Sequence, residues 1–150
     1  MIRLAAALLL LISLPAAAEP THDELIALIN QARADYGLGA VRGNANLGVA
    51  ARGHAADMAT NDFLSHTGSD GRKLVERVAA SGYAYAYVSE AVAGGARSPR
   101  EALHMWLTSA NHRDLVLSPE AREVGIGIAH SPHSTYKTYW AAVFGRRFGE

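Results

Sequence analysis

The order of patterns along the chain predicts an α+β domain with an antiparallel sheet. Helical patterns come first, strand patterns with one helix between them follow, and a hairpin comes last. No βαβ repeat is present, so a parallel sheet with crossover helices is not expected. No internal repeat, low-complexity tract or linker divides the 150 residues, which is typical of one domain of ordinary size.

Residues 1–18 have the pattern of a secretory signal peptide. Met1–Arg3 gives a positive start, Leu4–Leu14 an apolar core, and Pro15–Ala18 a small-residue cleavage site. We therefore expect a mature domain of residues 19–150 that is secreted or periplasmic. An uncleaved anchor is the weaker alternative, because the apolar run is shorter than the ~20 residues that span a bilayer.

Charge and cysteine content exclude several classes of function. Without Arg3, thirteen Lys and Arg residues stand against fourteen Asp and Glu residues, a net charge of −1 with neutral histidines. This balance does not predict the positively charged surface that nucleic-acid binding requires. The absence of cysteine excludes thiol chemistry, disulfides and lipid attachment through a thiol. We expect a monomer with no transmembrane anchor after signal cleavage.

The first predicted helix opens at a capping box and ends at Gly37. The Thr21 hydroxyl and the Glu24 carboxylate are placed to accept hydrogen bonds from free backbone N–H groups at the helix start. Asn30 and Arg33 lie off the apolar stripe, so we expect both on a solvated surface. The stripe itself consists of Leu25, Leu28, Ile29, Ala32 and Tyr36.

The second predicted helix, about Leu47 to Thr60 and capped by Asn44 or Asn46, points His54 inward. His54 shares a helical face with apolar residues, namely Leu47, Ala50, Ala51 and Met58.

Asp70 is expected to cap the third helix, which ends at Ser81-Gly82. Its inward residues are expected to be Leu74, Val75, Val78 and Ala79.

The next segment, Tyr83–Val88, alternates tyrosine and small residues and predicts a strand with three tyrosines on one half-buried face. Ser89–Gly95 interrupts this regularity with one carboxylate, Glu90. Ser98–Glu101 is a second capping box with proline at the first helical position, so a fourth helix begins there. Its expected buried stripe is Leu103, Trp106, Leu107 and Ala110.

The C-terminal part predicts a β-hairpin. Val124–His130 alternates bulky residues with small ones, and its glycines indicate that another segment packs close to the backbone. Residues 131–134 form the expected loop, and Thr135–Phe144 returns as the partner strand.

Four polar residues are candidates for a functional site: His54, His66, Glu90 and His112. Imidazole and carboxylate donors suit zinc or another divalent transition metal. The spacing contains no H-E-x-x-H motif, so it does not itself predict a metal site. For His54 the alternative is a core histidine satisfied by a backbone carbonyl. His66 and His112 lie at helix ends, from which a side chain reaches a cleft.

Other hydrolytic chemistries have weaker support. Serines lie near a histidine or carboxylate in sequence at Ser65, Ser89 and Ser109, but no G-x-S-x-G elbow is present. A glycosidase needs two opposed carboxylates, and nothing singles out Glu90 and Asp70 as that pair.

An ordered set of short motifs from Leu25 to Phe144 resembles the CAP superfamily (cysteine-rich secretory proteins, antigen 5 and pathogenesis-related 1 proteins), in particular its short, cysteine-free bacterial branch. The resemblance implies a three-layer α-β-α sandwich with a small antiparallel sheet and a large open cleft. The motifs are His54–Met58, Phe63–His66, Asp70-Gly71, Ser81–Tyr83, Glu90, Trp106–Arg113, Val124–Gly127 and Tyr139–Phe144.

The resemblance also implies which residues line the cleft. His66 matches the family's first histidine, Glu90 its glutamate, and His112 the histidine of the bacterial Trp-x-x-Ser-x-x-His-Arg motif. Ser109 stands at the second acidic position, and Tyr139 lies near the second histidine of the eukaryotic pattern. With His54, these are the expected ligand-binding residues.

The chain departs from the family pattern beside these positions. Ser89 and Ala91 flank the glutamate, and Ala141-Ala142 replaces the polar pair of the last strand. A full metal tetrad is therefore not expected. We expect at most a weakly bound divalent metal such as zinc on His66, His112 and Glu90, with water completing the shell.

Three functions follow from these expectations. The first is an exported, non-catalytic domain that binds lipid or sterol, a cell-envelope fragment or a protein in its cleft. The second is a metal-assisted hydrolase or protease, with metal on His66 and His112 and Glu90 as general base. The third is a structural envelope protein whose surface matters more than its cleft.

Overall fold

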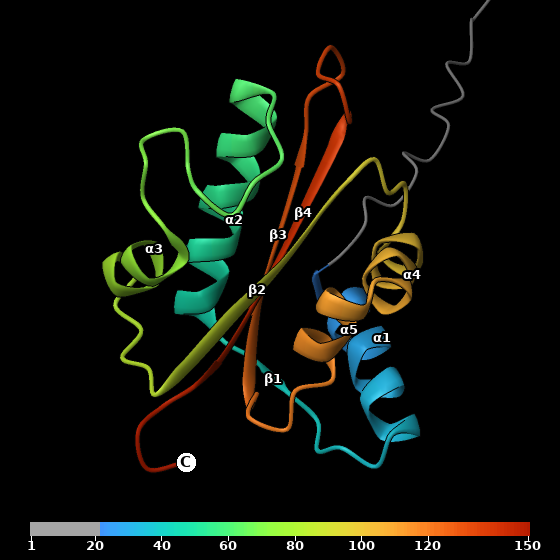
Figure 1. The fold of residues 1–150 in the computed structure, drawn as a ribbon, viewed down its shortest axis with the longest axis vertical. Helices are drawn as coiled ribbons and strands as arrows, with labels where there is room; N and C mark the ends of the chain where they lie inside the picture. Colours follow the sequence, from blue (N-terminus) through green and yellow to red (C-terminus); the bar gives the residue numbers. More distant parts are fainter. Residues whose placement is uncertain (1–21) are drawn as a thin grey trace, which may run out of the picture.

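A four-stranded sheet lies between two layers of helices (Figure 1). The structure is a computed structural model that describes residues 22–150, so the expected signal peptide and the Thr21 cap lie outside the described residues. The strands are β1 Arg42–Gly43, β2 Tyr87–Gly94, β3 Glu123–His130 and β4 Thr138–Arg146, in the spatial order β1-β3-β4-β2. The three longer strands pair antiparallel, and the two-residue β1 adds a short parallel pairing to β3.

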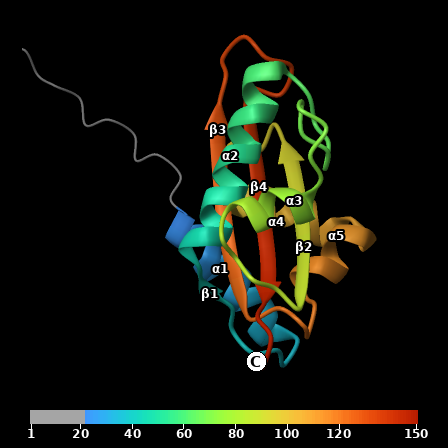
Figure 2. The ribbon, with the colours of Figure 1, turned by 90° about the vertical axis from the view of Figure 1, so that its left-hand side faces the viewer.

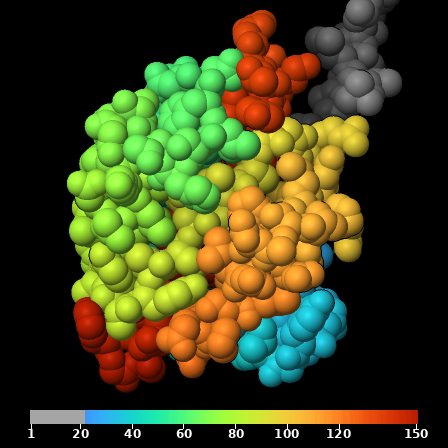
Figure 3. Space-filling model, in the orientation of Figure 1, coloured from blue at the N-terminus to red at the C-terminus, as the bar shows by residue number. Residues whose placement is uncertain are grey.

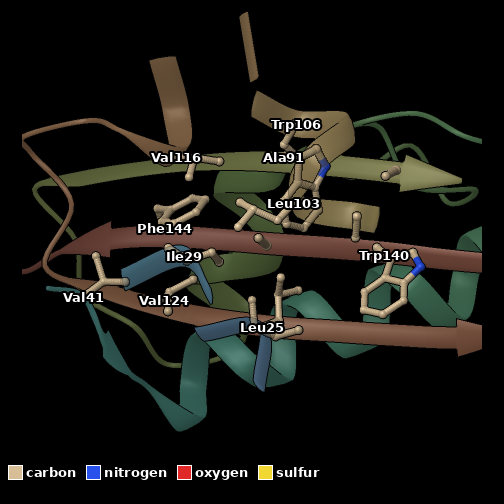
Figure 4. Close-up of a cluster of buried hydrophobic side chains, with 14 of the residues drawn as sticks. Leu25, Ile29, Val41, Ala91, Leu103, Trp106, Val116, Val124, Trp140 and Phe144 are labelled. Atoms are coloured by element: carbon tan, nitrogen blue, oxygen red, sulfur yellow. The ribbon is translucent and has the colours of Figure 1, made fainter. Parts of the chain in front are cut away.

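One layer consists of α1 His22–Asp35, α4 Pro99–Thr108 and α5 Ala110–Val116. Apolar side chains of these helices meet one face of the sheet in a buried cluster, where Trp106, Trp140 and Phe144 are the largest members (Figure 4). Trp106 also donates a hydrogen bond from Nε1 to the carbonyl oxygen of Val92 in β2, at 3.0 Å. The α4 helix is thereby fixed to the strand at the edge of the sheet.

The other layer consists of α2 Ala45–Asn61 and α3 Leu74–Ala80, which lie on the opposite face of the sheet (Figure 2). Asn44 caps α2, because its side-chain oxygen accepts hydrogen bonds from the N–H groups of Asn46 and Leu47. The glycines of β3 face this helix: a Cβ at Gly125 or Gly127 would lie 2.1 to 2.2 Å from the α2 backbone. The prediction of a close backbone approach at these glycines is confirmed.

Arg33 is buried, so the expectation of a solvated surface position was wrong. Its side chain is 1% exposed and donates hydrogen bonds to four backbone carbonyls, those of Gly39, Val116, Ser118 and Ala121. Asn30 likewise exchanges two hydrogen bonds with the backbone of Val41. These polar side chains pair the backbone groups of loops that pack against α1, which the pattern of α1 alone does not indicate.

The start of α3 also differs from the prediction. Asp70 accepts hydrogen bonds from Arg72 instead of capping the helix, and the Glu76 carboxylate accepts from the backbone N–H of Lys73. The helix has two turns and buries Val78, whereas Val75 and Ala79 are exposed.

The edge strand β2 begins four residues later than predicted. Tyr83–Ala86 is a loop, and the strand includes most of the Ser89–Gly95 stretch that was expected to interrupt it. Residues 90–93 are buried, because helices cover both faces of the sheet. A strand buried on both faces needs no alternation of polar and apolar residues, so its sequence lacks the usual signal.

Ser98 caps α4 as predicted, and its replacement by Ala is expected to lower the free energy of unfolding by about 1 kcal/mol. Its hydroxyl oxygen accepts a hydrogen bond from the N–H of Glu101 at 3.1 Å. The carboxylate of Glu101 bonds the N–H of Arg97 instead of completing the box. Urea unfolding of Ser98→Ala beside the exposed control Thr60→Ala measures the effect, and equal midpoints for the two variants would contradict it.

The predicted buried stripe of α4 is one residue too long. Ala110 is exposed, because it starts α5 and does not extend the stripe of α4.

Candidate functional site

Glu90 is the centre of a buried polar cluster. It lies in the middle of β2, its side chain is 1% exposed, and both carboxylate oxygens have partners. The imidazole of His66 donates from Nδ1 to one oxygen at 2.9 Å, and the guanidinium of Arg77 donates to the other at 2.7 Å. A buried carboxylate is stable in its charged form only with such partners.

His54 lies on the buried face of α2, as predicted. Its Nε2 is 2.7 Å from the carbonyl oxygen of Ser65 and 3.8 Å from the Glu90 carboxylate. This nitrogen therefore has the backbone-carbonyl partner that the core-histidine interpretation expects. The other ring nitrogen, Nδ1, is buried and has no hydrogen-bond partner in the described part of the chain.

Arg77, which was not among the predicted site residues, completes the cluster. Besides the bond to Glu90, its Nη1 donates to the carbonyls of His66 and Arg72, which fixes the loop that carries His66. A signal was present: Arg77 follows Leu74 by three residues and precedes Val78, so all three share the buried face of α3.

His66 lies at the surface end of this cluster, and His112 lies near it on α5. The side chain of His66 is 55% exposed and His112 is partly buried. The two imidazoles are close enough for the charge of His66 to influence the titration of His112. Ser109, partly buried, joins α4 to α5. Figure 3 shows a hollow between α2 and α3 on one side and α4 and α5 on the other, with β2 at its base.

Tyr139 is separate from this cluster. It is fully buried in the core between α2 and the sheet, and its hydroxyl donates to the Asp62 carboxylate at 2.8 Å. In the register of the sheet it lies opposite Gly94, whereas Glu90 lies opposite Val143. The structure thus brings together His54, His66 and Glu90, and it sets His112 near His66. Ser109 lies at the junction of α4 and α5, and Tyr139 lies elsewhere.

The cluster shifts the pKa values of its members in opposite directions. The hydrogen bond to Glu90 raises the pKa of His66, whereas burial lowers the pKa of His54. Burial, assisted by the charge of His66, lowers the pKa of His112. For Glu90, burial acts to raise the pKa, but the hydrogen bond from His66 and the charge of Arg77 outweigh it, so the pKa is lowered. Glu90 is therefore ionised at neutral pH.

An NMR titration of the histidine ring nitrogens is expected to separate these histidines. The pKa of His66 should lie above its ordinary 6.5, and those of His54 and His112 below it. In Glu90→Gln, which removes the charge, the pKa of His66 should fall below 6.5, because burial and the charge of Arg77, which both lower it, are then unopposed. A His66 pKa that is equal in both proteins would contradict the assigned pairing.

The same shifts determine how each histidine contributes to stability. His66 stabilises the fold fully below pH 6.5, and this contribution is lost as the pH rises through its raised folded-state pKa. His54 acts in the opposite sense, because protonation of the unfolded state removes stability as the pH falls below 6.5 toward its lowered folded-state pKa.

The arrangement does not fit a divalent metal held by His66, His112 and Glu90 together. Among residues 22–150, no three His, Asp or Glu side chains lie so that they could hold a metal ion. The Arg77 guanidinium occupies one oxygen of Glu90, and its positive charge opposes a cation there. A weakly bound zinc ion remains a prediction that metal titration tests.

The cluster also lacks the partner that acyl transfer would require. A carboxylate that orients a histidine is half of a Ser-His-acid arrangement. Within the described residues, however, no serine hydroxyl is hydrogen-bonded to His66, and Ser109 makes no side-chain cap bond. The geometry supports a polar contact surface better than a nucleophilic centre.

Comparisons with known proteins agree with this fold. The family model described as CAP, the cysteine-rich secretory protein family, matches residues 26–144. Within residues 22–150 no helix is both long and apolar enough to cross a membrane.

Several similar proteins are bacterial. The protein YkwD of Bacillus subtilis is 24% identical over 119 residues, which are 79% of this chain and 46% of YkwD. A crystal structure of an extracellular protein containing an SCP domain from Bacillus anthracis is 23% identical, with a TM-score of 0.75 over 83% of this chain and 40% of that one. An outer surface protein of Borrelia burgdorferi is 18% identical, with a TM-score of 0.75 over 83% and 91% of the two chains. The chain thus spans less than half the length of the two Bacillus proteins.

Proposed function

Because the chain belongs to the cysteine-rich secretory protein (CAP) family, we propose that residues 19–150 form an exported binding domain without catalytic activity. The observation that carries this proposal is the pairing of Glu90. Both of its oxygens are engaged, by His66 and by Arg77, and its pKa is lowered. A general base needs a free oxygen to accept a proton from water, and a metal ligand likewise needs an available oxygen. Because both oxygens of Glu90 are engaged, the cluster supports a role in holding the site in place.

The ligand is expected to lie in the hollow over β2, which we call the cleft, between His66 and His112. His66 presents a half-exposed ring whose Nδ1 is fixed by Glu90, so its other nitrogen faces the ligand with a defined orientation. Lipid or sterol, cell-envelope fragments and proteins are the candidate ligand classes. The signal-peptide pattern of residues 1–18 supports export, and the similarity to an extracellular protein of Bacillus anthracis agrees with it.

A binding panel with matched variants tests the proposal. The mature chain is titrated with cholesterol, with phosphatidylglycerol vesicles and with purified peptidoglycan fragments, and the histidine ring signals are followed by NMR. Binding should shift His66 and His112 and should weaken in His66→Ala and His112→Ala, but not in His104→Ala, an exposed histidine of α4. Binding that is unaffected by both cleft variants would overturn the assignment of the cleft.

A metal-assisted hydrolase is the second candidate, in which the imidazoles of His66 and His112 alone would hold the metal, because both oxygens of Glu90 are engaged by His66 and Arg77. Calorimetric titration of zinc into metal-stripped protein tests it. Micromolar binding that is abolished by both His66→Ala and His112→Ala would replace the first proposal and justify assays on peptides, esters and glycans. No heat of binding, and no hydrolysis with metal supplied, would eliminate this candidate.

A further inference from the structure

A pocket of about 240 Å³ lies between the loop that follows α1 and the turn that leads into β3, and the function proposed above does not use it. Figure 1 shows both segments at the end of the sheet where β1 and β3 begin. The lining consists of Arg33 of α1, residues 37–40, Pro119 and Arg122, and no cleft residue belongs to it. We call this site the α1–β3 pocket.

Within the described residues, the lining of the α1–β3 pocket carries two positive charges and no negative one. Neither Arg33 nor Arg122 forms an ion pair with an acidic side chain of residues 22–150. Glu120, which lies in the same turn as Pro119, is paired with Arg146 instead, at 2.8 Å. The two guanidinium groups therefore share one pocket without a counter-charge from the described part of the chain.

Arg33 holds one of these charges in the interior. It is 1% exposed, and its Nε, Nη1 and Nη2 all donate to backbone carbonyls. It therefore acts on an occupant of the pocket through its charge and not through a further hydrogen bond. Burial and the charge of Arg122 both lower the pKa of Arg33, so a negative group beside these two residues would stabilise the charged form.

Arg122 is exposed and supplies the group that an occupant contacts. Its Nη1 donates to the carbonyls of Pro119 and Ala121, which holds the guanidinium against the turn. Its Nε and Nη2 have no hydrogen-bond partner among residues 22–150. These two nitrogens lie along one edge of the planar group, where their parallel N–H bonds match two oxygens of one anion. Arg122 thus offers two oriented donors that the protein itself does not use.

The other lining residues that the structure describes have no polar side chain. They are two glycines, at positions 37 and 39, and the aliphatic residues Leu38, Ala40 and Pro119. Recognition in this pocket therefore rests on charge and on the donors of Arg122. The volume is below the range of about 300 to 1,000 Å³ that is typical of drug-sized ligands, so it suits one small charged group.

We propose that the α1–β3 pocket binds a doubly charged oxyanion of the phosphate class, either free phosphate or the phosphoryl group of a larger molecule. Two guanidinium charges without an acidic neighbour favour a dianion over a carboxylate, which carries a single charge. A phosphate monoester carries a charge of about −1.5 to −2 at pH 7 and offers oxygens to both donors of Arg122. The site goes beyond the function proposed for the cleft and does not depend on it.

The test is an NMR titration of the mature chain with inorganic phosphate, glycerol phosphate and acetate, at neutral pH and low ionic strength because salt screens such contacts. We expect saturable shifts of the backbone amides of residues 37–40 and 120–122 and of the Arg122 Nε–H signal. The dissociation constant for phosphate should be on the order of 1 mM, and that for acetate at least about tenfold higher. Tighter binding of glycerol phosphate than of inorganic phosphate assigns the site to a phosphoryl group of a larger molecule, and the reverse order assigns it to free phosphate.

Two arginine variants provide the control. Arg122→Gln removes the contact group and is expected to weaken phosphate binding at least about tenfold. Arg100→Gln removes the same charge from an exposed position of α4 outside the lining and should bind as the parent does. Phosphate should raise the midpoint of thermal unfolding of the parent and of Arg100→Gln, but not that of Arg122→Gln. The same unfolding curves show that Arg122→Gln, which alters an exposed side chain, is folded.

Four results would each overturn the proposal: no saturable shift with phosphate, equal phosphate binding by Arg122→Gln and the parent, equal weakening in Arg100→Gln, or acetate that binds as tightly as phosphate. The cleft variants His66→Ala and His112→Ala should bind phosphate as the parent does. Failure of the pocket proposal therefore leaves the cleft assignment standing, and failure of the cleft assignment leaves the pocket proposal standing.

Discussion

Replacing Glu90 by Ala is expected to lower the free energy of unfolding by about 3 to 5 kcal/mol. The substitution removes the carboxylate from Arg77, whose side chain is 8% exposed, and leaves that guanidinium buried without an anion. His66 loses the hydrogen bond that orients it. Denaturant unfolding followed by tryptophan fluorescence measures the loss, because Trp106 and Trp140 are both buried.

The surface pair Arg97–Glu101 provides the matched control for the loss of a carboxylate. Its side chains are 88% and 37% exposed. Glu101→Ala is therefore expected to change the free energy of unfolding far less than Glu90→Ala does. If Glu90→Ala were no more harmful than Glu101→Ala, the buried pairing of Glu90 would not be a source of stability.

Replacing Gly127 by Ala is expected to lower the free energy of unfolding by about 3 kcal/mol. This is the upper end of the usual loss when extra atoms are inserted into a well-packed core. The new methyl group would lie 2.2 Å from the backbone oxygen of Ala51, so the helix backbone itself must move. A displaced α2 also moves His54 away from the Ser65 carbonyl. Thermal unfolding should show the loss, and NMR should show a change in the His54 ring signals.

Gly53→Ala on α2 is the control for this substitution. No atom lies within 4 Å of the added Cβ, and alanine is the better helix former, so a gain of about 0.5 to 1 kcal/mol is expected. If the free energy of unfolding falls in Gly127→Ala and rises in Gly53→Ala, the effect of steric contact is separated from that of helix propensity. A Gly127→Ala protein as stable as the parent would show that α2 and β3 do not pack as closely as described.

The sequence predicted those parts of the fold that depend on local patterns. The helix with the Asn44 cap, the Ser98 cap of α4 and the β3–β4 hairpin follow from capping residues and periodicity over a few neighbours. The glycines of β3 also predicted a close packing partner, although not that the partner is α2. The resemblance to a family supplied the sandwich architecture, which periodicity alone did not.

Contacts between distant parts of the chain were the source of the errors. Arg33 was expected at the surface, because its carbonyl partners at Val116 and Ser118 lie more than 80 residues away. The predicted start of β2 was four residues too early, because the buried residues of this strand do not alternate between polar and apolar. Arg77 was overlooked, since its role depends on Glu90, which reaches it only when α3 and β2 pack together.

The position of Trp106 also bears on self-association. Strands at the border of a sheet expose backbone groups to which a second chain can pair, a common start of aggregation. In β2 the Val92 carbonyl is already bonded by the Trp106 indole, and the opposite border strand, β1, is two residues long. A second copy would have to displace a fully buried tryptophan before it could pair with β2 at Val92. Trp106 thereby helps to keep neighbouring molecules from joining their sheets at this border.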